Sequence, residues 1–82
     1  MERIKVQLKS PEIRGILLLL KKYEYLPFGL TPSAISTETE IPISSVRALL
    51  ANAMAPSDLV RRISFGHYKI TEKGITLLKE EF

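Results

Sequence analysis

The sequence feature that most constrains the fold is a short amphipathic stretch over residues 41–54. Its apolar side chains recur three, four, seven and eight residues apart, which is the spacing of one helical face. This buried stripe comprises Val46, Leu49, Leu50, Ala53 and Met54. Pro42 suits the first helical position and Pro56 cannot continue a helix. The pattern therefore predicts a helix over residues 42–55 with one buried face.

The opposite face of this helix carries one cation among small or polar side chains. Its members are Ser44, Ser45, Arg47, Ala48, Ala51 and Asn52. Such a face can lie against the wall of a DNA major groove without a bulky clash. Arg and Asn side chains can each form two hydrogen bonds to a base edge. The helix is therefore a candidate DNA-reading element.

Basic charge gathers in this helix and in the segment that follows it. The chain has a net charge of +3, and residues 41–69 carry Arg47, Arg61, Arg62 and Lys69 against Asp58 alone. A polyanion-binding surface requires such a cluster. A solvated surface with a slight excess of Lys and Arg fits the charges equally well, so charge alone leaves both interpretations open.

Two further helices are predicted ahead of this stretch. Ser10, Pro11 and Glu12 form a helix start, and the inner stripe that follows comprises Ile13, Ile16, Leu17, Leu20 and Tyr23. Leu18 and Leu19 widen the apolar surface beyond one face, which fits either a subunit interface or a generous core. Thr31 and Pro32 repeat the start signal for a short helix over about residues 33–38, with Ala34 and Ile35 facing inward.

The two ends of the chain predict strands and a last helix. Ile4, Val6 and Leu8 alternate with polar residues, so residues 3–9 read as a half-buried strand that pairs with the hairpin sheet or with a second subunit. Residues 59–63 and 68–70 predict a hairpin with a tight connection. Thr71 and Glu72 begin the last helix, in which Gly74 is expected to allow a close approach.

The length and composition indicate a single domain over residues 1–82 and exclude several classes. The chain has no cysteine, so disulfides and thiolate metal sites are excluded. No secretory pattern opens the chain, and the longest apolar run, residues 16–20, is too short to cross a bilayer. We therefore expect a cytoplasmic protein.

Enzyme chemistry finds little support in the residues. His67 is the single histidine, and the sequence has no nucleophile–base pair, metal-ligand spacing or glycine-rich phosphate loop. Glu80 and Glu81 are adjacent on a helix and point apart. We expect no catalytic residues, no metal and no cofactor.

The order strand, helix, loop, helix, turn, helix, hairpin, helix resembles a winged helix-turn-helix. The resemblance is to MarR-like and PadR-like transcription regulators and to small archaeal and archaeal-viral DNA-binding proteins. The residues that carry it are Ala34-Ile35, the run from Ile41 to Leu50, Leu59-Val60-Arg61-Arg62 and Tyr68-Lys69-Ile70-Thr71-Glu72-Lys73-Gly74. The implied fold is α+β: a three-helix core with a two- or three-stranded wing, an N-terminal strand and a C-terminal helix.

Two positions depart from the family pattern. Many members have glycine in the turn before the recognition helix and before the first wing strand, where this chain has Glu40 and Asp58. Asp enters left-handed backbone conformations at modest cost, whereas Glu is a poorer fit.

The resemblance also implies a set of DNA-contacting residues. By position they are Thr31, Ser33, Ser44, Ser45, Arg47, Asn52, Arg61, Arg62, Ser64, His67 and Lys69. Alternatives remain for some of them. Ser44 and Ser45 can instead cap their helix, one of Arg61 and Arg62 can lie over the apolar sheet face with its stem buried, and His67 can be a plain turn residue.

The expected function is sequence-specific binding of double-stranded DNA by a homodimeric transcription regulator, with helix 42–55 in the major groove and hairpin 59–70 as the wing. The expected dimer interface comprises Leu18, Leu19, Leu77, Leu78 and Phe82. A winged-helix protein-interaction module is the alternative, favoured by the acidic stretch 24–40 and the broad apolar first helix. A plasmid or viral replication or segregation factor would use the same surface. No small-molecule effector site is readable.

Overall fold

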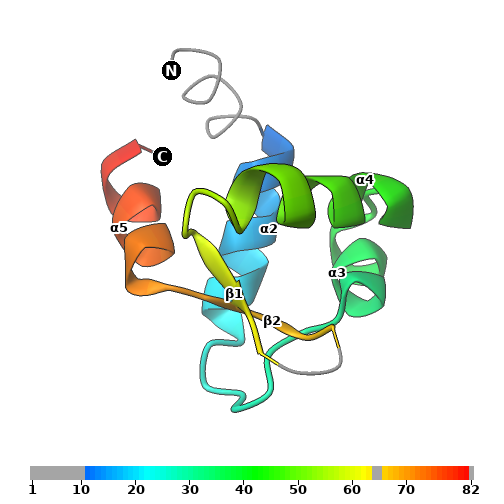
Figure 1. Cartoon of the computed structure of the whole chain (residues 1–82), viewed down its shortest axis with the longest axis horizontal. Coiled ribbons are helices and arrows are strands. Elements are labelled where there is room, and N and C mark those ends of the chain that lie inside the picture. Colours follow the sequence, from blue (N-terminus) through cyan, green and yellow to red (C-terminus); the bar gives the residue numbers. More distant parts are fainter. Residues whose placement is uncertain (1–10, 64–65, 82) are drawn as a thin grey trace.

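The structure is a computed structural model that describes residues 11–63 and 66–81. These residues form an α+β fold of helices and one two-stranded antiparallel hairpin (Figure 1). The elements are α2 (Pro11–Lys22), α3 (Pro32–Thr39), α4 (Ile43–Leu49), η1 (Leu50–Met54), β1 (Val60–Arg62), β2 (Tyr68–Ile70) and α5 (Glu72–Glu81). The strand predicted over residues 3–9 lies outside the described residues.

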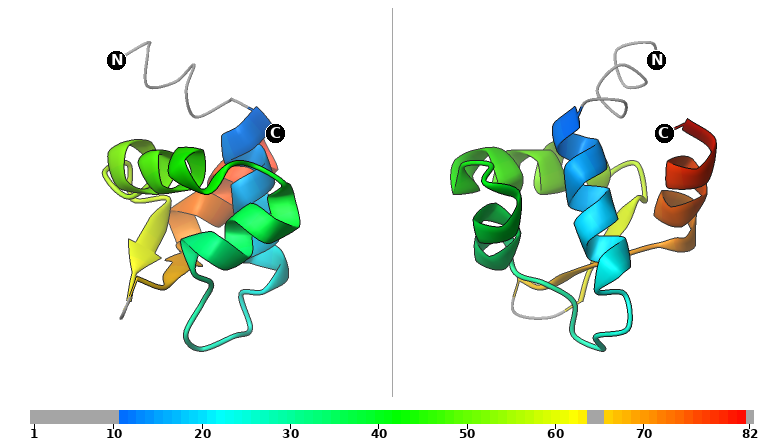
Figure 2. Two further views of the ribbon diagram at one scale, coloured as in Figure 1. Left: turned by 90° about the vertical axis from the view of Figure 1, so that its right-hand side faces the viewer. Right: turned by 180° about the vertical axis from the view of Figure 1, so that it is seen from behind.

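Helix α2 is the centre of the core. It lies between α3 and α5 and also packs on β2 (Figures 1 and 2). Its inner stripe is buried as predicted, apart from the half-buried Tyr23. The core comprises Ile13, Ile16, Leu17, Leu20, Ile35, Val46, Leu50, Met54, Leu59, Val60, Ile70 and Leu78. Each fully buried aliphatic side chain stabilises the fold by about 1.5–3 kcal/mol, so α2 holds the other elements together.

The predicted helix over residues 42–55 is present but changes its winding. Residues 43–49 are α-helical, and η1 continues as a π-helical turn in which the Ala55 N–H donates to the Leu50 carbonyl at 2.9 Å. The 3.6-residue period does not predict this wider turn. Leu50 and Met54 both stay in the core, and the Leu59 N–H donates to the Met54 carbonyl at 2.9 Å where the chain turns toward β1.

Helix caps confirm two of the predicted starts. The Thr31 hydroxyl accepts a hydrogen bond from the Ala34 N–H at 3.1 Å, with Pro32 in the first turn. The Thr71 hydroxyl accepts from the Gly74 N–H at 3.1 Å and donates to the Asp58 carbonyl at 2.5 Å. Ser44 and Ser45 do not cap α4. They lie inside the helix, and Pro42 occupies its N-cap with no side-chain cap bond.

Glu40 and Asp58 both adopt left-handed backbone conformations, each with φ of 63°. They are the two non-glycine residues with positive φ among those that the structure describes. Glu40 ends α3, where its N–H donates to the Ser36 carbonyl at 2.8 Å. A left-handed conformation costs an L-residue about 1–2 kcal/mol, so both turns carry strain that glycine would remove.

The hairpin pairs Val60 with Ile70, Arg61 with Lys69 and Arg62 with Tyr68. The chain after α2 adds one isolated bridge, in which Leu30 and Tyr68 exchange two backbone hydrogen bonds of 2.9 and 2.7 Å. Gly29, with φ of 68°, permits this approach because a Cβ there would overlap the Tyr68 carbonyl. The predicted hairpin is therefore confirmed, and within the described residues the Leu30–Tyr68 bridge is its one addition.

Candidate nucleic-acid interface

The outward face of α4 and η1 is the first part of the candidate site. Ser44, Arg47, Ala48, Ala51 and Asn52 are exposed, as the helical period predicts. Ser45 is half-buried and so differs from its predicted neighbours. The side chains on this face are short, apart from that of Arg47.

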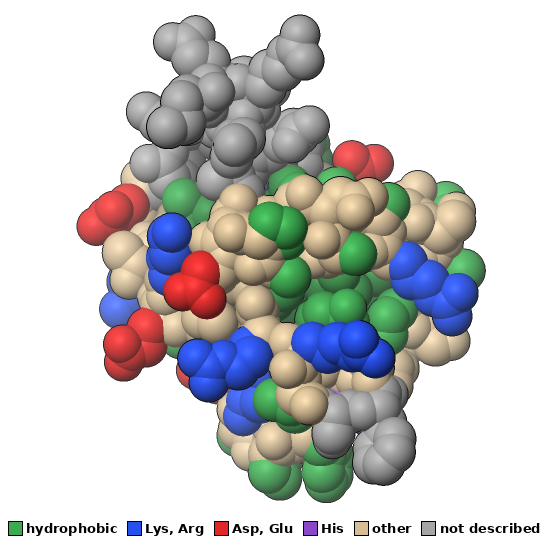
Figure 3. All heavy atoms as spheres, viewed as in Figure 1, with side chains coloured by type: hydrophobic (Ala, Val, Ile, Leu, Met, Phe, Trp, Pro, Cys, Tyr) green, Lys and Arg blue, Asp and Glu red, His purple; other side chains and the backbone are tan. Residues whose placement is uncertain are grey.

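A hollow of about 450 Å³ lies between this face, the start of α3 and the hairpin. Figure 3 shows this side of the molecule, with Lys and Arg side chains over the helix and the hairpin and hydrophobic atoms between them. The lining residues are Thr31, Pro32, Ser33, Arg47, Ala51, Arg62, Gly66 and Tyr68. We call it the arginine hollow. It unites four of the predicted contact residues: Thr31, Ser33, Arg47 and Arg62.

The charged side chains that line the arginine hollow are all cationic. Arg47 approaches from the helix and Arg62 from β1, and none of the described residues that line the hollow is acidic. The first turn of α3 also lies at this wall. Pro32 has no N–H and the Ala34 N–H is capped by Thr31, so the Ser33 N–H is the group of this turn that remains for an anion. The hollow therefore suits a polyanion.

Strand alternation decides which arginine enters the arginine hollow. Successive side chains of a strand point to opposite faces, so Arg62 shares a face with Val60 and Arg61 takes the other. The register places Tyr68 opposite Arg62 and Lys69 opposite Arg61. Arg62 is thus the arginine on the apolar sheet face, although its side chain is exposed at the strand end.

Arg61 lies at a second hollow, of about 610 Å³, on the other side of the hairpin. Its lining residues are Asp58, Arg61, Ile63, Lys69, Ile70, Thr71, Glu72 and Lys73. Two carboxylates here offset three cations, so this hollow suits a polyanion less well than the arginine hollow.

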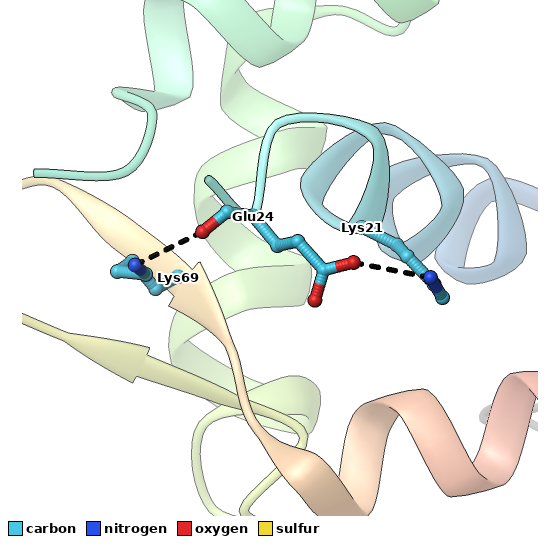
Figure 4. A network of polar contacts seen from close by, with 3 residues as sticks. All are labelled: Lys21, Glu24 and Lys69. Atoms are coloured by element: carbon cyan, nitrogen blue, oxygen red, sulfur yellow. Dashed lines mark hydrogen bonds and ion pairs between the residues drawn. The ribbon is translucent and has the colours of Figure 1, made fainter. Parts of the chain in front are cut away.

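Lys69 is bound to its own chain. Its ammonium donates to the carbonyls of Glu24 at 3.2 Å and Leu26 at 3.0 Å, while the Glu24 carboxylate pairs with Lys21 at 3.1 Å (Figure 4). Lys69 therefore ties the loop after α2 to the hairpin, and its charge faces that loop.

The remaining predicted contacts lie apart from the arginine hollow. Ser44 and Asn52 are exposed along the helix but do not line the hollow. His67 is half-buried, with its ring centroid 6.4 Å from that of Phe28 in an edge arrangement. Ser64 lies outside the described residues.

Four lining residues were not predicted: Pro32, Ala51, Gly66 and Tyr68. Tyr68 had a partial signal, because alternation along the predicted second strand places it on a face with Ile70. The observed register then sets it opposite Arg62. Ala51 sits one helical turn from Arg47, but its small side chain carries no chemical signal. Pro32 and Gly66 have no polar side chain that could mark them as contact residues.

The predicted dimer residues fall into different environments. Leu18 is 48% exposed, Leu19 and Leu77 are half-buried, and Leu78 is a core residue at 9%. Phe82 lies outside the described residues. Among the described members of this set, Leu18 therefore has the most surface to offer a partner.

Comparison with known proteins assigns no role to this site. The chain matches no family model, no curated protein and no solved structure. The described residues contain no His, Cys, Asp and Glu group that could hold a metal ion. No helix within the described part of the chain is long and apolar enough to cross a membrane.

Proposed function

We propose that this chain is a sequence-specific double-stranded DNA-binding protein of the winged helix-turn-helix type, acting as a homodimeric transcription regulator. The observation that carries the proposal is the arginine hollow. Arg47, Arg62 and the start of α3 come from three separate elements and converge on one surface without an acidic residue among its described lining.

In this proposal each part of the surface has its own role. The helix over residues 42–55 enters the major groove, where the small side chains of Ala48 and Ala51 permit close approach and Arg47 bonds a base edge. Arg62 and Ser33 contact phosphates on either side of the groove and set the orientation of the helix. Binding releases condensed counterions, so affinity falls as salt rises.

The test compares two adjacent arginines that the fold places on opposite faces. Fluorescence anisotropy measures binding to a labelled duplex between about 50 and 200 mM salt. We expect Arg62→Ala to weaken binding to all sequences and to lower the salt slope by about 1. Arg61→Ala is the matched control, since it removes the same charge from the other hollow, and it should change affinity less. Arg47→Ala should relax base preference.

Two results would contradict this assignment. Absence of binding to any duplex at about 50 mM salt would remove the DNA-binding proposal itself. Equal losses from Arg61→Ala and Arg62→Ala would show that the arginine hollow has no special part in binding.

A protein-interaction module is the second candidate, supported by two exposed aromatic side chains. Tyr25 is 71% and Phe28 59% exposed, both in the loop between α2 and α3. Exposed aromatic residues are enriched in protein interfaces. Failure to bind DNA at low salt would favour this candidate, whereas a replication or segregation factor would bind DNA through the same surface as a regulator.

A further inference from the structure

Helix α2 presents an apolar face that the other described residues leave open. A shallow hollow of about 460 Å³ runs along it, lined by Pro11, Glu12, Gly15, Leu18, Leu19, Lys22, Glu38, Thr39 and Ile41. In the view from behind, α2 lies in front of the other elements (Figure 2, right). This α2 groove shares no lining residue with the arginine hollow.

The α2 groove has opposite charges at its two ends. Glu12 lies in the first turn of α2 and Lys22 in the last, ten residues apart. At 1.5 Å per residue, about 15 Å separates them along the helix axis. The α2 residues between them that line the groove are uncharged: Gly15, Leu18 and Leu19. Glu38 of α3 adds a second carboxylate to the lining of the groove. An occupant that complements the charges of α2 itself therefore carries a cation opposite Glu12 and an anion opposite Lys22.

We propose that the occupant is α2 of a second copy of this chain, packed antiparallel across a two-fold axis. The proposed two-fold axis lies level with Leu17, so residues equally far from Leu17 along the chain lie at the same height in the pair. Leu17 itself faces the core of its own domain. Glu12 then meets Lys22 of the second copy, and Lys22 meets Glu12 of the second copy. A parallel pair would instead place like charges together at both ends. Glu12 and Lys22 are thus complementary to their counterparts in one orientation only, as an isologous interface requires.

Gly15 and the leucines beside it fit this packing. A Cβ at Gly15 would meet no atom within 4 Å, so the helix surface there is open and has no side chain. Gly15 and Leu19 are equally far from Leu17, so a leucine of one copy lies over the glycine of the other. The pairing also covers Leu18, which the isolated domain leaves 48% exposed. Close helix approach over glycine increases van der Waals contact along the groove.

This inference rests on the homodimer in the proposed function and is independent of DNA binding. One helix offers less area than a standard interface of ~800 Å² per partner, so we expect a weak dimer. The test therefore uses the free full-length protein without DNA. If the protein binds no DNA, the dimerisation measurement still tests this inference. If the protein is monomeric, the anisotropy measurement still tests DNA binding.

The decisive experiment reverses the charges singly and then mixes the variants. Sedimentation equilibrium from about 1 µM to about 1 mM protein at low salt measures the dimer dissociation constant. Glu12→Lys and Lys22→Glu each replace two attractions per dimer with two repulsions, and each should weaken the dimer roughly tenfold. An equimolar mixture of the two variants restores both opposite-charge pairs and should recover wild-type affinity as a heterodimer.

Matched controls make the same charge changes on α5. Glu80→Lys and Lys79→Glu alter exposed side chains outside the α2 groove and should leave the dissociation constant unchanged. Thermal melts at low protein concentration check that every variant folds. A wild-type protein that stays monomeric throughout the range would overturn the proposal. It would also be overturned by α2 variants that dimerise like the wild type, or by a mixture that fails to recover affinity.

Discussion

At the scale of single residues, Glu40 forms the expected turn in a backbone conformation that is strained for a residue with a Cβ. It closes α3 with φ of 63° and donates its N–H to the Ser36 carbonyl. Its side chain is exposed and the described structure assigns it no hydrogen bond. The turn before α4 is therefore held by the backbone of Glu40 and not by its carboxylate.

We expect Glu40→Gly to stabilise the fold by about 1 kcal/mol, because glycine adopts positive φ without the steric cost that a Cβ brings. The melting temperature should rise by about 4–8 °C for a domain of this size. Glu40→Ala is the control, since it removes the carboxylate but keeps the Cβ. A Glu40→Gly protein that melts below Glu40→Ala would show that the left-handed turn is absent.

Lys69 has a side chain that suits phosphate binding, but its contacts are those of a residue that stabilises the fold. Its ammonium is bound to two carbonyls of the loop after α2. We expect Lys69→Met to destabilise the fold by about 1–3 kcal/mol, since charge-assisted hydrogen bonds are lost. The salt slope of DNA binding should stay unchanged, because no phosphate contact is removed.

Lys73→Met is the control for Lys69→Met, because Lys73 lines the same hollow and is exposed. Chemical denaturation gives the stability of both variants and anisotropy gives the salt slope. A slope that falls by about 1 in Lys69→Met would assign Lys69 to a phosphate instead.

At the scale of elements, the packing of α5 depends on Gly74. A Cβ at this position would overlap the Leu59 carbonyl and crowd the Ile70 side chain. Glycine inside a helix costs about 1 kcal/mol relative to alanine, so its presence here is explained by close contact with the hairpin. The helix start is held at the same point, where Thr71 bonds both the Gly74 N–H and the Asp58 carbonyl.

Two glycines in helices therefore predict opposite effects of the same substitution. Gly74→Ala should destabilise the fold by about 1–2 kcal/mol, because overlap with backbone outweighs the gain in helix propensity. Gly15→Ala should stabilise it by about 1 kcal/mol, since space there is open. Urea unfolding at low protein concentration, where the chain is monomeric, measures both. Stabilisation by Gly74→Ala would show that α5 does not approach Leu59 closely.

At the scale of the whole molecule, the arginine hollow and the α2 groove share no lining residue. The arginine hollow joins α3, the α4 helix and the hairpin, whereas the α2 groove is lined by α2 and the end of α3. A net charge of +3 is modest, so the concentration of cations at one hollow matters more than their total for binding a polyanion. Separate surfaces allow the proposed DNA binding and self-association to be tested one at a time.

Local patterns in the sequence predicted the described helices, most of their buried positions and the hairpin, although Leu49 and Ala53 of the predicted stripe are only half-buried. Val46, Leu50 and Met54 are buried because residues three or four apart share a helical face. Thr31 and Thr71 were identifiable as caps because a cap bonds a backbone N–H only three residues away. These features depend on neighbours close in the chain, so no knowledge of the packed domain was needed.

Only the tertiary structure decided which cations lie on the same surface of the molecule. The bonds of Lys69 span 43 and 45 residues, and no local pattern marks the carbonyls that accept them. Arg61 and Arg62 are equivalent in composition, and the side of the sheet that packs on the core separates them. The π-helical turn of η1 likewise was not readable from the spacing of Leu50 and Met54, which an ordinary α-helix also satisfies. Each of these outcomes depends on contacts between distant segments, which exist only once the core around α2 has formed.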